Sequence, residues 1–227
     1  MLEEKMNSNT ELRITGDGSH TLYLPDYSEH YHSVHGAIQE SQHVFIKNGL
    51  QYATTLFPDI NILEIGFGTG LNALLTYSYS FRHKINIQYT SLEPFPLDKK
   101  ILKALNYHEI LGFKTEQYNL ICNCEWEKAI AFEANFSLFK TKSKVEDFST
   151  NQKYSIIYFD AFAPRVQPEL WTVAIFQKLY HYLAESGILV TYCAKGQVKR
   201  NLRQAGFFVE TLQGPPGKRE MIRAIKE

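Results

Sequence analysis

The sequence predicts an α/β protein built on a doubly wound, mostly parallel sheet of the Rossmann-like type. From Ile60 onward, short apolar segments alternate with segments of helical pattern, which is typical of repeated β-α units. A glycine-rich turn follows the first apolar segment. The last part, 207–225, has the pattern of an antiparallel hairpin around Gly-Pro-Pro-Gly, so we expect a C-terminal antiparallel hairpin strand in the sheet.

The composition is that of an ordinary globular protein. With 227 residues, 44% hydrophobic and 21% charged, the chain is long enough for one α/β domain with a full core. It contains no apolar run of membrane-spanning length, so we expect no membrane partner. Its three cysteines form no C-x-x-C pair, which favours a reducing, cytoplasmic setting. We therefore predict one Rossmann-like domain over 59–227 and an N-terminal extension, 1–58, that packs on or caps the ligand site.

The expected elements follow from apolar periodicity and from breakers. The extension holds a strand that ends before Pro25 and a helical stretch. The middle of the domain is less regular, with a helix expected from Glu125 and a short strand near 136–139 or Val145. The remaining predictions are strands at 20–24, 60–65, 86–93, 155–160, 187–193, 207–212 and 220–225, and helices over 36–56, 71–81, 97–111, 169–183 and 198–205.

The glycine turn indicates the kind of ligand. Three alternating glycines follow Glu64, which stands inside the preceding strand. A dinucleotide fingerprint would place its last glycine one residue later, to seat a pyrophosphate at the helix N-terminus. A carboxylate before the turn would repel a pyrophosphate but suits S-adenosylmethionine, which carries a cationic sulfur and an ammonium group. The alternative is that the glycines serve only a tight turn. The predicted cofactor contacts in this stretch are Glu64, Gly66, Phe67, Gly68, Gly70 and Asn72.

Acidic residues at three further strand ends complete the predicted site. Ligands of open α/β sheets bind beyond the carboxyl ends of the strands. Glu93, followed by Pro94, is expected to accept hydrogen bonds from a ribose diol, and Asp147 to meet an adenine amino group. Asp160 follows four apolar residues, so we expect it to position an amine nucleophile and to contact the cofactor, unless it only caps the next turn. Either Asp160 or a water beside it would take the proton of the amine.

Three histidines, His30, His32 and His35, form an H-x-H-x-x-H pattern. No cysteine partner or H-E-x-x-H helix accompanies them, so we expect no metal and interpret the segment as a polar, aromatic loop over the site.

The C-terminal tail is basic although the formal net charge is zero. Residues 195–227 hold eight basic and three acidic residues, a pattern that could meet phosphates or could be a solvated face. Aromatic residues could stack on a base that leaves its neighbours, or could be core. The candidate phosphate contacts are Lys195, Lys199, Arg200, Lys218 and Arg219, and the candidate stacking residues are Tyr27, Tyr31, Phe162 and Trp171.

Several blocks together resemble the methyltransferase domain of the bacterial tRNA-modifying MnmC family. They are L-E-I-G-F-G-T-G-L-N from Leu63, S-L-E-P-F-P-L from Ser91, D-A-F-A-P from Asp160, G-K-R-E-M from Gly217 and H-G-A-I-Q-E-S from His35. The resemblance runs from about Tyr23 to the C-terminus. Position 94 is Pro where the family often has Lys, and position 161 is Ala where Gly is common.

The resemblance implies transfer of a methyl group from S-adenosylmethionine to 5-aminomethyl-2-thiouridine at the tRNA wobble position, which gives the methylaminomethyl form. It places Asp160, Phe162 and Pro164 near the target amine and makes the tRNA anticodon loop the partner. The chain is too short to hold the flavin oxidase domain to which many members are fused. We therefore expect a stand-alone form that depends on a separate enzyme for its aminomethyl uridine.

Three alternatives differ in class. One is a small-molecule amine methyltransferase on the same fold, because fold does not fix function, and the zero net charge favours it mildly. A nucleotide-binding oxidoreductase is disfavoured by Glu64 and the early Gly70. An inactive partner subunit is disfavoured by the intact glycines and Asp160.

Overall fold

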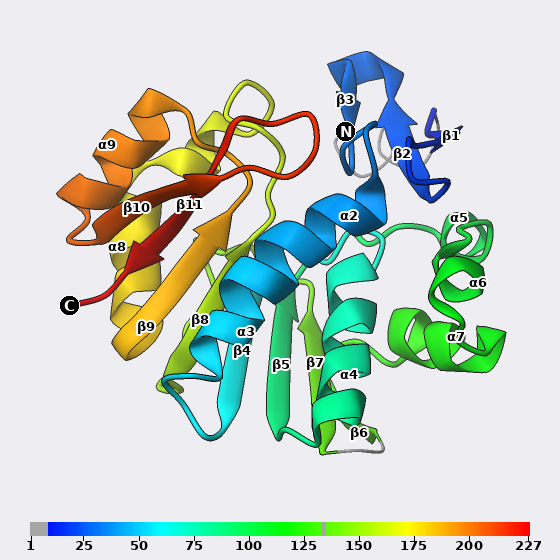
Figure 1. Cartoon of the computed structure of the whole chain (residues 1–227), viewed down its shortest axis with the longest axis horizontal. Helices are drawn as coiled ribbons and strands as arrows, with labels where there is room; N and C mark the ends of the chain where they lie inside the picture. Colours follow the sequence, from blue (N-terminus) through cyan, green and yellow to red (C-terminus); the bar gives the residue numbers. More distant parts are fainter. Residues whose placement is uncertain (1–8, 133–134) are drawn as a thin grey trace.

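The computed structural model describes residues 9–132 and 135–227, which fold around one eight-stranded sheet (Figure 1). Five adjacent strands are parallel, β11 pairs antiparallel with β9 and β10, and β6 pairs antiparallel with β7. In spatial order the strands are β10 (Phe208–Gln213), β11 (Glu220–Ile225), β9 (Leu183–Thr191), β8 (Tyr154–Phe159), β4 (Ile60–Ile65), β5 (Ile87–Leu92), β7 (Phe136–Thr141) and β6 (Ala129–Phe132).

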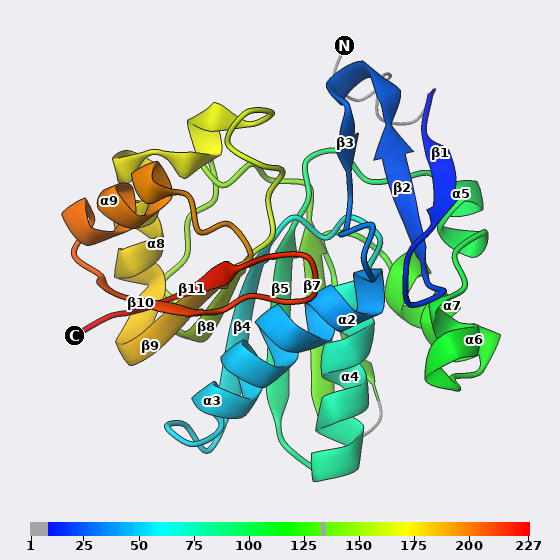
Figure 2. The ribbon, with the colours of Figure 1, turned by 45° about the horizontal axis from the view of Figure 1, so that its top comes forward.

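Helices cover both faces of this sheet (Figures 1 and 2). One face packs against α4 and against a continuous helical segment formed by α2, η2 and α3; the other packs against α8 and α9. Gly49 lets the helical segment approach the sheet, because an added Cβ would lie 2.9 Å from the Ile156 side chain. The helices are α2 (Ala37–Ser41), η2 (Gln42–Leu50), α3 (Gln51–Ala53), α4 (Leu71–His83), α5 (Lys99–Lys103), α6 (Tyr107–Leu111), α7 (Thr115–Asn123), η3 (Pro168–Trp171), α8 (Val173–Tyr182) and α9 (Gly196–Gln204).

A small antiparallel sheet precedes the helical layer. It consists of β1 (Glu11–Ile14), β2 (His20–Leu24) and β3 (Glu29–His30), with the short helix η1 (Pro25–Tyr27) between β2 and β3. The predicted extension thus contains this sheet and a helical segment that covers the main sheet. No helix in the described ranges is long and apolar enough to cross a membrane.

The predicted fold class is confirmed, whereas two predicted helices differ from the structure. The helix expected over 97–111 is split into α5 and α6, and Asn106 between them bonds through its side chain to the backbone of Gly18 and His20. The helix expected from Glu125 is wrong: α7 ends at Asn123, and β6 follows. Lys140 explains this end, since its ammonium donates to the carbonyls of Ile121 and Cys122 in the last turn.

Candidate functional site

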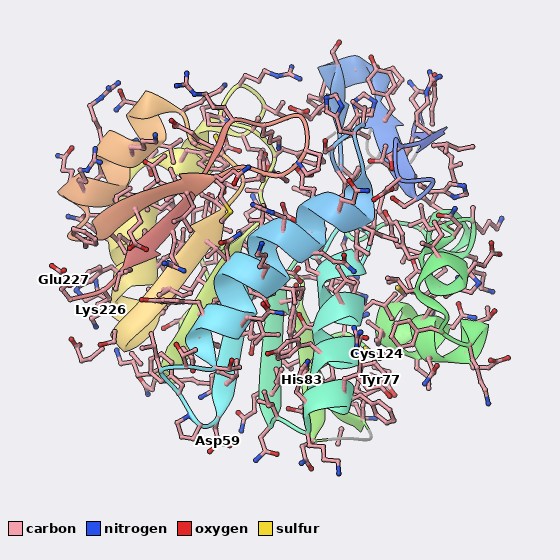
Figure 3. All side chains as sticks on the ribbon, in the orientation of Figure 1. Asp59, Tyr77, His83, Cys124, Lys226 and Glu227 are labelled. Carbon is pink, nitrogen blue, oxygen red and sulfur yellow. The ribbon has the colours of Figure 1, made fainter. Side chains whose placement is uncertain are left out.

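A cavity of about 450 Å³ lies at the carboxyl ends of β4, β5 and β8. Asp59, labelled in Figure 3, precedes β4 and marks the opposite edge of the sheet. The segment 29–35, the start of the helical layer and the loop between β10 and β11 also line the cavity. The sheet supplies its floor, and segments far apart in sequence supply its walls.

The glycine turn forms part of the floor, and its backbone requires glycine. Gly66 has φ +93°, and an added Cβ would lie 2.8 Å from the Asp160 carbonyl oxygen. Gly68 has φ +50°, with the Tyr31 ring 3.2 Å from the position of an added Cβ. These close approaches join the ends of β4 and β8 and let Tyr31 cover the turn.

Replacing Gly66 by Ala should lower the free energy of unfolding by more than the same change at Gly112. Both glycines have positive φ, but nothing lies within 4 Å of an added Cβ at Gly112. Gly112→Ala therefore reports the backbone cost alone, about 1–3 kcal/mol, and Gly66→Ala adds a steric clash. Chemical denaturation of both variants measures the difference; equal losses would show that the contact with Asp160 relaxes freely.

Glu93 links the second strand to the glycine turn. Its carboxylate accepts the Gly68 N–H and the Phe95 N–H, each at 3.0 Å. Burial raises the pKa of Glu93 to about 7, although these two hydrogen bonds act in the opposite direction. Glu93 and Pro94 both line the cavity, as expected for residues at this strand end.

Glu64 lies beneath the turn and outside the cavity lining. Its side chain is fully buried and accepts a hydrogen bond of 2.6 Å from the Ser91 hydroxyl. Burial raises its pKa to about 7. Gly70 and Asn72 also lie outside the lining, so the part of the predicted stretch that lines the cavity is Gly66, Phe67 and Gly68.

Asp160 reaches the cavity from the end of β8. The Asn72 amide donates to its carboxylate at 2.8 Å, which orients the group. Burial, with further contributions from Glu40 and Glu64, raises the pKa of Asp160 well above its ordinary value. The raised pKa makes the ionised carboxylate a stronger base, so that once a bound cation favours its ionised form it can accept a proton from an amine.

Two of the four candidate stacking residues line the cavity. The rings of Tyr31 and Phe162 meet edge to face at 4.9 Å between centroids. Trp171 is buried in the core and donates to the Phe162 carbonyl, and Tyr27 lies outside the lining. Pro164 also lies outside it.

The histidines line the cavity but form no metal site. His32 is buried, and its Nε2 lies 2.7 Å from the Thr69 hydroxyl in the glycine turn. The His30 ring packs on Tyr23, and the His35 ring packs against Gly217. Within 9–132 and 135–227, no group of three His, Cys, Asp or Glu side chains could hold a metal ion.

The predicted phosphate contacts separate into two groups. Lys218 lines the cavity, where its ammonium lies 2.6 Å from Glu40, and Lys199 is paired with Glu220 at 2.6 Å. By contrast, Lys195, Arg200 and Arg219 are exposed. Lys218 and Lys199 are therefore paired with carboxylates, whereas the other three candidate phosphate contacts are exposed.

Asp147, the predicted adenine contact, lies outside the cavity lining. Asp147 is exposed and outside the lining, whereas its neighbour Glu146 lines the cavity. The loop 144–148 turns at this point, and the Asp147 N–H donates to the Lys144 carbonyl. The structure thus brings Glu146, and not Asp147, to the cavity, after a segment whose strand was poorly defined in the sequence.

The sequence reasoning missed Glu40 and Tyr192. Glu40 lies on α2, 5% exposed, and Tyr192 follows β9 and donates to the Ala161 carbonyl at 2.9 Å. The H-G-A-I-Q-E-S block contains Glu40, so the resemblance was the available signal.

This sheet order, with a cavity over a glycine turn and an acid at the second strand end, is the arrangement of a nucleotide-type ligand site. Residues 106–227 match the family model described as S-adenosyl-L-methionine-dependent methyltransferase. The chain belongs to this family, and S-adenosyl-L-methionine is its cofactor. The SAM-bound amino pentose methyltransferase CalS10 from Micromonospora echinaspora shares the fold alone, with a TM-score of 0.50 and 12% identity over 85% of this chain and 92% of that one.

Closer relatives confirm the resemblance to MnmC. The chain is 30% identical over 221 residues to the tRNA 5-methylaminomethyl-2-thiouridine biosynthesis bifunctional protein MnmC of Leptospira interrogans, covering 92% of this chain and 34% of that protein. The MnmC of Burkholderia pseudomallei is also 30% identical, covering 89% of this chain and 34% of that protein. The crystal structure of MNMC2 from Aquifex aeolicus has a TM-score of 0.76 and 28% identity, covering 96% of this chain and 70% of that one. The chain thus spans about a third of the length of these bifunctional relatives.

Proposed function

We propose that this methyltransferase converts 5-aminomethyl-2-thiouridine at the wobble position of tRNA to its methylaminomethyl form. The observation that carries the proposal is the acidic lining of the cavity. Six Asp or Glu side chains and two lysines line it, in a chain whose formal net charge is zero, and a bound cation favours the ionised form of the buried acids among them. An acidic cavity favours cationic ligands, and both the sulfonium cofactor and an aminomethyl group are cationic.

The residues fit the cofactor as follows. Gly66, Phe67 and Gly68 offer bare backbone, and Glu93 offers a buried carboxylate for a ribose diol. Glu64 and Asn72 flank the turn without lining the cavity, and bond to Ser91 and Asp160 respectively. Glu146, which lines the cavity, replaces Asp147 as the candidate for the adenine end.

Asp160 provides the proton chemistry. An alkyl amine has a pKa of about 10.4, so it arrives protonated and must lose a proton before its nitrogen can attack. Asp160, or water beside it, takes that proton, and the Asn72 amide holds the carboxylate in place. S-adenosylmethionine, when bound, supplies an electrophilic methyl carbon that accepts the amine lone pair as its carbon–sulfur bond breaks toward sulfur. The product amine retains a proton as a secondary ammonium ion.

The names of the relatives support tRNA as the substrate. A wobble base lies in a loop and can be read when it leaves its stack, and Tyr31 and Phe162 offer aromatic surfaces inside the cavity. A separate activity that exposes the aminomethyl group would have to act first.

Replacing Lys195 and Arg200 together by Ala should weaken tRNA binding and flatten its salt dependence. Both are exposed, and they lie just after β9, at the sheet edge that holds the cavity. Each lost phosphate contact should reduce the slope of log K against log salt by about 0.7–0.9. Filter binding at salt concentrations between about 50 and 200 mM measures this slope.

Lys47 and Lys153 provide the matched control. Both are exposed, and Lys153 precedes β8 at the opposite edge of the sheet. Their double replacement by Ala should leave the slope unchanged. An equal effect of both double variants would mean that general charge, not this edge, governs binding.

A small-molecule amine remains a second candidate, favoured by one observation. Lys199 and Lys218 are engaged by Glu220 and Glu40, which leaves fewer free cations for phosphates than the sequence suggested. The deciding experiment offers labelled S-adenosylmethionine with aminomethyl-bearing tRNA, bulk tRNA or small amines. Label in aminomethyl-bearing tRNA alone supports the proposal, and label in small amines alone refutes it.

A further inference from the structure

One corner of the cavity holds an ammonium group that belongs to the protein itself. The Lys218 Nζ lies 2.6 Å from the Glu40 carboxylate and 3.9 Å from the centre of the Tyr192 ring. A carboxylate beside an aromatic face is a recognised receptor for a cation. Tyr192 in turn donates to the carbonyl of Ala161, the residue after Asp160.

The corner joins four separate parts of the fold. Glu40 comes from α2, Asp160 from the end of β8, Tyr192 from the end of β9, and Lys218 from the loop between β10 and β11. Figure 2 shows this loop reaching across toward the start of α2. Asp160, Glu40 and Lys218 all line the same cavity, and the charges of Glu40 and Lys218 shift the pKa of Asp160 in opposite directions.

Glu40 is fixed, whereas Lys218 can leave. The Glu40 side chain is 7% exposed, and its other oxygen accepts the Ser33 N–H at 2.8 Å. The Lys218 side chain is 32% exposed and ends in a flexible chain of methylene groups. Displacement of its ammonium would leave Glu40 buried and unpaired, which is costly unless another cation replaces it.

We propose that Glu40, in the cavity that Asp160 also lines, is the receptor for the primary ammonium group of the substrate, and that Lys218 occupies this receptor until the substrate displaces it. A lysine side chain ends in CH2–NH3+, which is the same group that 5-aminomethyl uridine presents. Tyr192 offers its ring face to either cation. Glu40 then determines specificity for an amine over a neutral group of the same size. This inference rests on the proposed function.

The test measures binding of two nucleosides to the whole chain with S-adenosylhomocysteine present, so that no transfer occurs. The probes are 5-aminomethyluridine and the neutral 5-hydroxymethyluridine, and calorimetry gives their Kd values. Lys218→Met should bind the aminomethyl probe at least about fivefold more tightly, because the competing ammonium is gone, with the hydroxymethyl probe unchanged. Glu40→Gln should weaken the aminomethyl probe at least about tenfold, with little effect on the other.

Lys218→Met alone leaves Glu40 as an unpaired buried carboxylate and could fail to fold for that reason. The double variant Glu40→Gln/Lys218→Met removes both charges and avoids this cost. It should bind the aminomethyl probe as weakly as Glu40→Gln does. Weaker or unchanged aminomethyl binding by Lys218→Met would overturn the inference, since Lys218 would then be a substrate contact or a mere support. Equal losses for both probes in Glu40→Gln, or a double variant that binds more tightly than Glu40→Gln, would do the same.

Failure of the proposed function has a different signature. In that case the unsubstituted protein would transfer no methyl group to aminomethyl-bearing tRNA. If only the inference fails, the unsubstituted protein still transfers the methyl group to aminomethyl-bearing tRNA. The Lys218→Met and Glu40→Gln variants then lack the expected selective changes in Kd for the aminomethyl probe.

Discussion

Replacing Asp160 by Asn is expected to lower kcat by about 10²–10⁴-fold while the Kd for S-adenosylmethionine changes little. Asn keeps the size of the side chain and removes its ability to ionise and to take a proton. The Asn72 amide, which donates to Asp160, can still donate to the side-chain oxygen of Asn. Single-turnover methyl transfer and calorimetry with the cofactor separate the two quantities.

Asp147→Asn is the matched control, because Asp147 is exposed and outside the cavity lining. It should keep full activity. If Asp160→Asn retained activity within about threefold, far below the contribution expected of a general base, Asp160 would be only a cap for the turn that follows β8.

Replacing Glu64 or Glu93 by Gln should stabilise the cofactor-free protein at high pH relative to the parent. Burial raises the pKa of each carboxyl group from 4.5 to about 7. The folded state therefore favours the protonated form, and the stability that this gives is complete below pH 4.5 and lost as the pH rises to about 7. At 1.36 kcal/mol per pH unit, the cost of ionising each group is about 3 kcal/mol.

Denaturant unfolding at pH 4.5 and pH 9 measures this effect as a difference between variant and parent. The difference cancels the contributions of other titrating groups. For each variant the free energy of unfolding, relative to the parent, should rise by about 3 kcal/mol between the two pH values. The exposed Glu146, changed to Gln, is the control and should show no such rise. A flat difference for Glu64→Gln would mean that its carboxylate is solvated when ionised.

The features that could be predicted from the sequence are those that depend on the local pattern of residues. The apolar run at 60–65, the glycines after it and the acid at 93 are properties of short segments, and the structure places them as expected. The class of fold followed from their alternation with helices. The cofactor followed from the charge and spacing of one turn, and the family match agrees with it.

The features that the sequence did not predict depend on contacts between distant segments. Nothing near Asn106 in the sequence indicates that its side-chain amide bonds to the backbone of Gly18 and His20, between α5 and α6. Likewise, Lys218 looked like a free cation because Glu40, its partner, lies 178 positions earlier in the chain. A charge count along the tail cannot detect such a pair.

The buried contact between His32 and Thr69 makes the stability of the fold sensitive to acid. Burial lowers the pKa of His32 to about 4, so the ring is neutral at physiological pH and brings no positive charge to the cavity that it lines. The stability that it contributes is complete above pH 6.5 and is lost as the pH falls to about 4. Charging the ring would put an unpaired cation beside the glycine turn. We therefore expect the small sheet β1–β3 to detach first on acidification, and hydrogen exchange at pH 3.5 should show its amides opening before those of β4.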